Sequence, residues 1–275
     1  MRTRYRKILV AAGATLASMA LLASAAEATP PAAPYEDFAG CPSSAEQPFI
    51  ANCLKLNFTG GQIGFGNRAI PVTNPFSLSG GYEQETGEFL FNSEGGIKPV
   101  RQTVPGGLVG LTGYKWLDEA LAGSNALKLY ATIELAGQPG SVELPTRVLP
   151  IKIHLENQFL GKGCYVGSNA NPIVLDLTTG TTSPPPPNQP ITGQPASGLQ
   201  PEAGRPQVLL ATGGVYVDNA YAVPAASGCE FTFGSFHQNI DSLVNTRYGL
   251  PAAAGRNTTV LNFTRQIVSP EVVYP

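Results

Sequence analysis

Apolar and polar side chains alternate along residues 127–135, which gives the clearest local signal in the chain. One face would carry Leu127, Leu129, Ala131, Ile133 and Leu135, and the other Lys128, Tyr130, Thr132 and Glu134. Because successive side chains of a strand point to opposite sides of the sheet, this pattern predicts a strand with one buried and one solvated face. Residues 149–156 repeat the pattern, with Ile151, Ile153 and Leu155 inward.

Further short apolar segments are separated by glycine pairs. Strands are predicted over 54–58, 89–92, 172–177, 207–211, 215–217 and 259–267. Turns are predicted at the Gly-Gly pairs that begin at residues 60, 80, 95, 106 and 213. Short strands with glycine turns are typical of antiparallel sheets. The expected fold class is therefore mainly β: an antiparallel β-sandwich or barrel-like domain with one or two short helices and a long Pro-rich loop.

Two segments have helical periodicity instead. The first, 114–122, carries Trp116, Leu117, Ala120 and Leu121 at near-helical spacing. The second, 236–248, places on one stripe Phe236, Ile240, Leu243, Val244 and Tyr248. Both are predicted to be short helices that pack between strands.

The first 28 residues have the layout of an export signal. A positive opening with Arg2, Arg4, Arg6 and Lys7 precedes an apolar run and small residues, which allow cleavage after Ala25 or after Ala28. The apolar run, 8–23, is shorter than the roughly 20 residues that a spanning helix needs. We expect a signal peptide over 1–28, an extended N-terminal lead-in over 29–50 and a single disulfide-stapled β domain over 51–275. The protein should be secreted, or loosely associated with the envelope, without a transmembrane anchor.

Charge argues against nucleic acid as a partner. The whole chain has 17 basic and 19 acidic residues, and cleavage after Ala28 removes four basic residues and Glu27. The mature chain then carries 17 − 4 = 13 basic and 19 − 1 = 18 acidic residues, a net charge of −5. A protein that binds nucleic acid usually presents a basic stripe, and none is found here. Gly and Pro are abundant and charged residues few, which favours turns and strands over helices.

The four cysteines are predicted to form two disulfides. An even number of cysteines in an exported chain usually forms a disulfide framework, with three possible pairings here. We favour Cys41 with Cys53 and Cys164 with Cys229. The alternative, a zinc site, needs closely spaced ligands, and no C-x-x-C motif is present. The second bridge would cross the Pro-rich stretch 181–195, which includes Pro184 to Pro187, and so would make it an excursion within one domain rather than a linker.

The chain has only two histidines, and neither belongs to a recognisable catalytic motif. His154 is expected on the solvated face of its strand, beside Lys152 and Glu156. His237 would open the second predicted helix, with Asp241 one turn further on, so that the two side chains touch. Such a pair could orient a general base, but no G-x-S-x-G elbow supplies a nucleophile.

Other motifs give no firmer chemistry. Gly64-Phe65-Gly66-Asn67-Arg68-Ala69 matches a loose dinucleotide fingerprint, but Pro71 interrupts the helix that should follow. Carboxylates that could serve a glycosidase are Glu83, Glu85, Glu88, Asp118 and Glu119, although charges of this kind are far more often solvated residues of turns and helix starts. We predict no catalytic residue, no cofactor and no metal site.

Several segments resemble a family of secreted actinobacterial proteins to which no activity is assigned. They include Ile151-Lys152-Ile153-His154-Leu155-Glu156-Asn157 and Cys164-Tyr165-Val166-Gly167-Ser168, and the resemblance is strongest after Lys152. Similar segments are 159–161, 172–175, 178–184, 190–193, 217–224, 228–229, 250–251 and 255–258. The resemblance covers most of the mature chain. It implies export and an ordered Pro-rich stretch, and it adds no site residues.

Two functions follow from these patterns. The first, which we favour, is a non-enzymatic secreted or envelope-associated β-protein, structural or ligand-binding, with a cell-wall or glycan ligand. Solvated strand faces rich in Thr, Asn, Gly and Tyr suit such a ligand. The alternative is a secreted hydrolase that acts on envelope polysaccharide or ester through carboxylates or His237.

Overall fold

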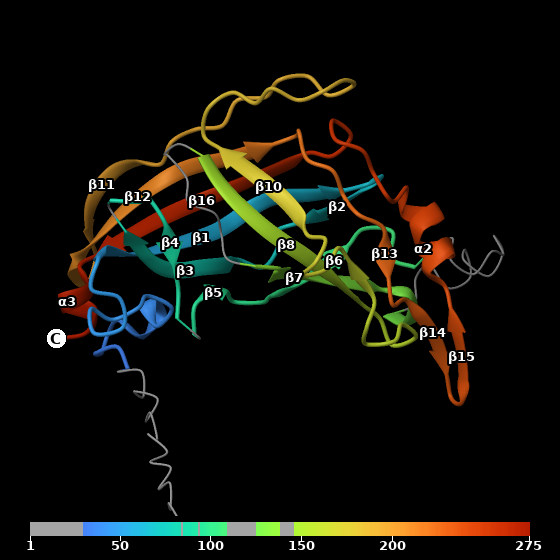
Figure 1. The fold of residues 1–275 in the computed structure, drawn as a ribbon, viewed down its shortest axis with the longest axis horizontal. Coiled ribbons are helices and arrows are strands. Elements are labelled where there is room, and N and C mark those ends of the chain that lie inside the picture. Colours follow the sequence, from blue (N-terminus) through green and yellow to red (C-terminus); the bar gives the residue numbers. More distant parts are fainter. Residues whose placement is uncertain (1–29, 84, 93, 109–124, 138–145) are drawn as a thin grey trace, which may run out of the picture.

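The computed structural model describes residues 30–83, 85–92, 94–108, 125–137 and 146–275 (Figure 1). The first strands along the chain are β1 (Ile50–Phe65), β2 (Arg68–Pro71), β3 (Phe76–Glu83), β4 (Phe89–Leu90), β5 (Gly96–Ile97), β6 (Arg101–Val104), β7 (Leu129–Leu135) and β8 (Thr146–Glu156). The others are β9 (Tyr165–Val166), β10 (Ile173–Thr178), β11 (Ser197–Glu202), β12 (Arg205–Asp218), β13 (Ala226–Ser227), β14 (Glu230–Phe233), β15 (Phe236–Asn239) and β16 (Thr259–Val268). The described helices are α2 (Asp241–Tyr248), α3 (Pro270–Val273) and the 3-10 turns η1 (Glu36–Phe38) and η2 (Asn125–Leu127).

Antiparallel pairing joins fourteen of these strands into one sheet. Its central order is β13-β9-β8-β10-β12-β16-β1-β3-β4, and β7 joins β8 to β6. The sheet curves strongly, so that β1 and β3 lie opposite β7 and β8 around a shared core (Figure 1). The mainly β fold expected from the alternating pattern is confirmed, and its arrangement is that of a β-sandwich.

The main core forms from the inward faces of alternating strands. Leu54, Leu56 and Phe58 of β1 share one cluster with the alternate residues of β7 and β8 predicted to point inward, including Ile133 and Ile153. Leu129, Ile151 and Ile153 are completely buried. Burying a large aliphatic side chain contributes about 1.5–3 kcal/mol, so these rows provide most of the force that closes the sheet on itself.

A second, smaller core covers the other face of the sheet. Its members are Tyr35, Phe38, Cys41, Ile50, Cys53, Val208, Val268 and Val273. Cys53 alternates with Leu54 in β1 and therefore points away from the main core. The segment around η1 and the short α3 cover this face together, at the end of the sheet where the chain terminates (Figure 1). Residues 30–50 are thus packed onto the sheet and include a 3-10 turn, whereas the sequence suggested an extended lead-in.

Three of the glycine pairs predicted as turns lie inside strands. The pairs that begin at residues 60, 80 and 213 belong to β1, β3 and β12. Gly213 has a φ of +72° and stands at a register shift between Ala211 and Gly214, which is a β-bulge. A Cβ on Gly214 would lie 2.4 Å from the ring of Phe263. The two short strands predicted over 207–211 and 215–217 are therefore one bent strand, β12.

The helix predicted over 236–248 is wrong in its first half. Residues Phe236–Asn239 form β15, which pairs with β14 in a hairpin, and the helix α2 begins only at Asp241. Gly234 adopts a φ of +61° in the connecting turn, a conformation that glycine reaches without strain. The apolar residues matched the spacing of a helix because Phe236 and Ile240 are four residues apart in the sequence. That spacing does not distinguish a continuous helix from a strand that is followed by a helix.

Some predictions fall on residues that the structure does not describe. The signal peptide, the helix 114–122, Asp118 and Glu119 lie outside the described residues.

Disulfides join Cys41 to Cys53 and Cys164 to Cys229, the pairing that the sequence favours. Two intramolecular disulfides indicate a non-cytoplasmic protein. Within the described ranges, no helix is long and apolar enough to cross a membrane.

The Pro-rich stretch 181–195 is tied back to the sheet by polar contacts. Thr181 bridges Thr192, and Gln194 bridges Val215 of β12. The Asn188 side-chain amide donates to the carbonyl oxygens of Asn219 and Asn257, at 2.8 and 2.9 Å. These bonds connect the tip of the stretch to segments about 30 and 70 residues away in the chain.

Candidate functional site

The solvated faces of four neighbouring strands join into one polar surface. Backbone register aligns Arg101 of β6, Thr132 of β7, His154 of β8 and Tyr165 of β9 in a row across the sheet. The adjacent row aligns Tyr130 with Glu156. Side chains at paired positions on one face lie close enough to interact. The solvated faces predicted separately for 127–135 and 149–156 are therefore parts of a single surface.

Glu156 occupies the centre of this surface and is held by two partners. The Arg101 guanidinium donates to both carboxylate oxygens, at 3.1 and 2.9 Å, and the Thr132 hydroxyl donates at 2.8 Å. These hydrogen bonds, that of Arg101 above all, lower the pKa of Glu156 from its ordinary value of 4.5. Glu156 is therefore ionised at neutral pH, and Arg101 is fixed in one position.

Arg101 and Tyr130 form a flat platform. The guanidinium carbon lies 4.7 Å from the centre of the Tyr130 ring, within the range of a cation–π contact. Because the bidentate bond to Glu156 fixes the guanidinium plane, little entropy is lost when a ligand stacks on it. The platform is therefore preorganised for a flat or ring-shaped ligand.

A second cluster surrounds His154 on the same surface. Its ring stacks on Tyr165 with centroids 4.4 Å apart, and its Nδ1 lies 3.8 Å from the Glu134 carboxylate. Its Nε2 lies 3.0 Å from the carbonyl oxygen of Lys162 and must carry the hydrogen, since a carbonyl only accepts. Partial burial, followed by the effect of Glu134, raises the pKa of Tyr165. Only 19 % of the His154 side chain is exposed, so this histidine is largely covered by its neighbours and is not a plain surface histidine.

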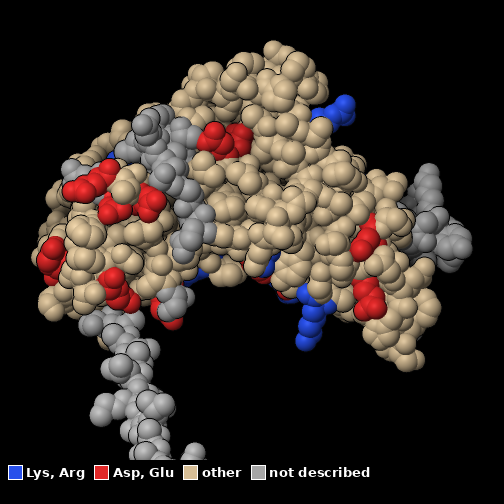
Figure 2. All heavy atoms as spheres, viewed as in Figure 1, with Lys and Arg blue, Asp and Glu red and all other residues tan. Residues whose placement is uncertain are grey.

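A groove of about 540 Å³ opens over this surface. Its floor is formed by Arg101, Tyr130, His154 and Glu156, and its rim by Asn125, Lys128, Asn157, Gln158, Leu160, Gly161 and Lys162. Figure 2 shows the lower edge of the molecule hollowed, with atoms of both basic and acidic side chains visible along it. We refer to this feature as the β6–β8 groove.

The far wall of the β6–β8 groove is joined to the β14–β15 hairpin. The Gly161 amide donates to the carbonyl of Glu230 at 2.7 Å, and the Thr232 amide donates to the carbonyl of Phe159 at 2.8 Å. The segment 157–162 therefore pairs with β14 through backbone hydrogen bonds, as a neighbouring strand would. The hairpin itself projects away from the large sheet (Figure 1).

The structure separates the catalytic pair considered from the sequence. The His237 Nδ1 lies 3.3 Å from Glu230 on the exposed hairpin, and both side chains are about half exposed. Asp241 instead accepts hydrogen bonds from the Cys229 amide and the Asn239 side chain. The predicted His237–Asp241 contact is therefore wrong, because His237 belongs to a strand and the helix begins after it.

The candidate carboxylates that the structure describes, other than those above, are not brought to the groove. Glu83, Glu85 and Glu88 lie around the exposed connection between β3 and β4, where Glu83 accepts a hydrogen bond from Thr86. The Gly64–Ala69 motif is the hairpin between β1 and β2, with Gly66 and Asn67 in its turn. Among the described residues, no three His, Cys, Asp or Glu side chains form a group that could hold a metal ion.

Sequence reasoning missed Arg101, because β6 was not predicted. The strand is only four residues long, although its burial alternates, with Gln102 and Val104 inward and Arg101 and Thr103 outward. That alternation in Arg101-Gln102-Thr103-Val104 is a weak signal that could have identified it. Its pairing with β7, 28 residues later in the chain, is a tertiary fact that the local pattern does not contain.

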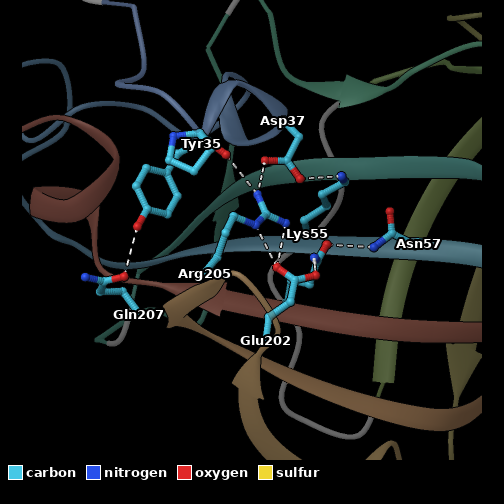
Figure 3. A network of polar contacts seen from close by, with 9 residues as sticks. Tyr35, Asp37, Lys55, Asn57, Glu202, Arg205 and Gln207 are labelled. Atoms are coloured by element: carbon cyan, nitrogen blue, oxygen red, sulfur yellow. Dashed lines mark hydrogen bonds and ion pairs between the residues drawn. The ribbon is translucent and has the colours of Figure 1, made fainter.

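A second polar network lies at the other end of the sheet and has a structural role (Figure 3). Arg205 donates to Asp37 at 2.6 Å and to Glu202 at 2.7 Å, and Lys55 donates to the other oxygen of Asp37 at 2.7 Å. Tyr35 reaches Gln207 at 3.1 Å. Every charge in this network has an opposite partner, so it fixes the η1 segment onto β1 and β12 and leaves no open binding position.

No protein-family model, curated protein or solved structure matches this chain. The geometry of the β6–β8 groove is therefore the basis for the function proposed below.

Proposed function

We propose that this chain is a secreted or envelope-associated, non-enzymatic β-protein that binds a glycan in the β6–β8 groove. The observation that carries the proposal is the fixed platform of Arg101 on Tyr130, with the side-chain amides of Asn125 and Gln158 among the residues that line the same groove. An aromatic face offers a large apolar contact at low entropic cost, and amides both donate and accept hydrogen bonds. Sugar rings present matching C–H faces and hydroxyl groups.

Secretion belongs to the same proposal. The export-signal pattern of residues 1–28 and the two disulfides both support a destination outside the cytoplasm. The resemblance of residues 151–157 and 164–168 to secreted actinobacterial proteins points in the same direction, and these segments include His154, Glu156 and Tyr165 of the groove surface. A cell-wall or extracellular polysaccharide is the ligand that such a protein would meet.

The alternative, a secreted hydrolase, has weaker support. A glycosidase needs one carboxyl group that keeps its proton near neutral pH. The carboxyl group on the groove floor, that of Glu156, has the opposite property, because Arg101 and Thr132 lower its pKa. His237 lies on the projecting hairpin with Glu230 as its charged neighbour, away from the groove floor.

The test is a glycan and cell-wall binding screen on the mature protein, followed by calorimetry with each ligand found. Tyr130→Ala should weaken binding about tenfold, since aromatic stacking contributes about 0.5–1.5 kcal/mol beyond the buried area. The control is Phe49→Ala, which removes an aromatic ring that is 67 % exposed and lies outside the groove. Urea unfolding of both variants checks that the fold is kept. Absence of carbohydrate binding, or equal binding by Tyr130→Ala and the unaltered protein, would contradict the proposal.

A further inference from the structure

Two lysines on the rim of the β6–β8 groove have no acidic partner among the described residues. Lys128 and Lys162 are both exposed, and neither forms an ion pair there. Arg101, by contrast, is neutralised by Glu156. The described residues that line the groove therefore carry an excess of two positive charges, on a chain whose net charge is −2.

An aromatic ridge continues from the groove along the β14–β15 hairpin. Phe159 stacks on Phe231 with ring centroids 5.9 Å apart, and Phe231 meets Phe236 edge-on at 6.2 Å. Phe159 and Phe231 are partly buried, and 53 % of Phe236 at the outer end of the ridge is exposed. Phe159 directly precedes Leu160 and Gly161, which line the groove, so the ridge begins next to the groove rim.

We infer that the ligand of the β6–β8 groove is an anionic polysaccharide chain, bearing carboxylate or phosphate groups, that extends from the Arg101–Tyr130 platform onto the Phe159–Phe231–Phe236 ridge. This inference rests on the proposed function and specifies its ligand class. The unpaired lysines supply the charge complementarity, which favours an anionic over a neutral glycan. The aromatic ridge supplies a second stacking surface, which favours a chain over a single sugar.

The ridge carries a single acidic side chain, against the two lysines of the groove rim. The hairpin 230–239 contains one carboxylate, Glu230, and it lies 3.3 Å from the His237 Nδ1. On the groove floor, Glu156 has its oxygens occupied by Arg101 and Thr132. Lys128 and Lys162 therefore remain the charged groups of the rim that are open to a ligand anion.

The first experiment compares charged and neutral probes. Binding of polygalacturonate, phosphorylated dextran and neutral dextran is measured by calorimetry at low and high NaCl concentration. The double variant Lys128→Gln, Lys162→Gln should bind an anionic probe about tenfold more weakly, because two charge contacts are lost. Dextran binding should not change. The matched control is Arg256→Gln, which removes an exposed cation that lines a separate pocket with Asn67 and Pro187.

The outcomes separate this inference from the proposed function. A preference for polygalacturonate or for phosphorylated dextran over neutral dextran supports the inference and identifies the carboxylate or the phosphate as the recognised group. Equal affinity for dextran and the anionic probes, or full binding by the double variant, overturns the inference but leaves glycan binding intact. Binding of no carbohydrate at all overturns both.

The second experiment tests the ridge. Phe236→Ser should reduce binding of long polygalacturonate several-fold and leave binding of its disaccharide unchanged, since only a long chain reaches the end of the hairpin. Phe49→Ser is the control. Equal loss for both lengths, or no loss, overturns the role of the ridge. Binding of neutral phospholipid vesicles that disappears in Phe236→Ser would show that a lipid is the occupant instead, and would also overturn it.

Discussion

At the scale of single residues, charged side chains connect segments that are far apart in the chain. Asp37 receives hydrogen bonds from Lys55 and from Arg205, which is 168 residues away. Burial alone would raise the pKa of Asp37, but the hydrogen bonds and charges of Arg205 and Lys55 outweigh it, so the pKa falls below its ordinary value of 3.8. A lowered carboxyl pKa means that the ionised form stabilises the fold.

The substitution Asp37→Asn should therefore destabilise the protein by about 1–2 kcal/mol at pH 7, the range for charge-assisted hydrogen bonds near a surface. The difference from the unaltered protein should be fully present above pH 3.8 and diminish as the pH falls through the lowered pKa of Asp37. Urea unfolding measured from pH 7 down to pH 2 follows this loss. Glu36→Gln, an exposed neighbour in η1, should have no effect, and a difference that is as large at pH 2 as at pH 7 would contradict the electrostatic explanation.

Single residues of the groove were partly predictable. Alternation placed Lys128, Tyr130, His154 and Glu156 on solvated faces, and the structure finds them there. Their neighbours were not predictable, because the contact of Glu156 with Arg101 spans 55 residues and depends on the order of strands in the sheet. The pairing of His237 was mistaken for a similar reason, since its partner is fixed by a hairpin and not by helical spacing.

At the scale of elements, glycine decided several strand boundaries. Gly66 and Asn67 form the two-residue turn between β1 and β2, with Phe65 paired to Arg68. Gly66 has a φ of +62°, and a Cβ there would lie 2.0 Å from the carbonyl oxygen of Tyr248. The motif that resembles a dinucleotide fingerprint is thus explained by the needs of a tight hairpin packed against the end of α2.

A left-handed backbone conformation alone costs a non-glycine residue about 1–2 kcal/mol, and Gly66→Ala should destabilise the protein by more than this. Gly204 is the matched control, because its φ is +83° and a Cβ there would have no atom within 4 Å. Gly204→Ala should cost only the backbone term. Chemical denaturation of the two variants measures both values. Equal losses would mean that the Tyr248 contact does not constrain the turn.

At the scale of the whole molecule, two cores and two disulfides hold the sheet. The main core closes the sandwich, and the second attaches the η1 segment and α3 to the outer face. Cys164 and Cys229, both completely buried, tie the strand pair β8–β9 to the base of the β14–β15 hairpin. That bridge closes a loop of 65 residues, which includes the Pro-rich stretch, whereas Cys41–Cys53 closes one of 12.

Removing the longer bridge should cost more stability. In the loop-entropy model, Cys164→Ala with Cys229→Ala loses about 4 kcal/mol, and Cys41→Ala with Cys53→Ala about 3 kcal/mol. Equilibrium unfolding of the two double variants measures the order, and peptide mapping without reductant verifies the pairs. A peptide that links Cys53 to Cys164, or free thiols in the oxidised protein, would contradict the fold described for both cores.

The sequence by itself determined which residues could be buried. Alternation along β7 and β8 and the abundance of Gly and Pro were enough to predict a mainly β fold, because side-chain direction in a strand depends only on position. Only the tertiary structure decided that the solvated faces of β6, β7, β8 and β9 adjoin, since strand order and register arise from packing between segments up to about 65 residues apart. The β6–β8 groove depends on this strand order and register, which is why no motif in the sequence predicts it.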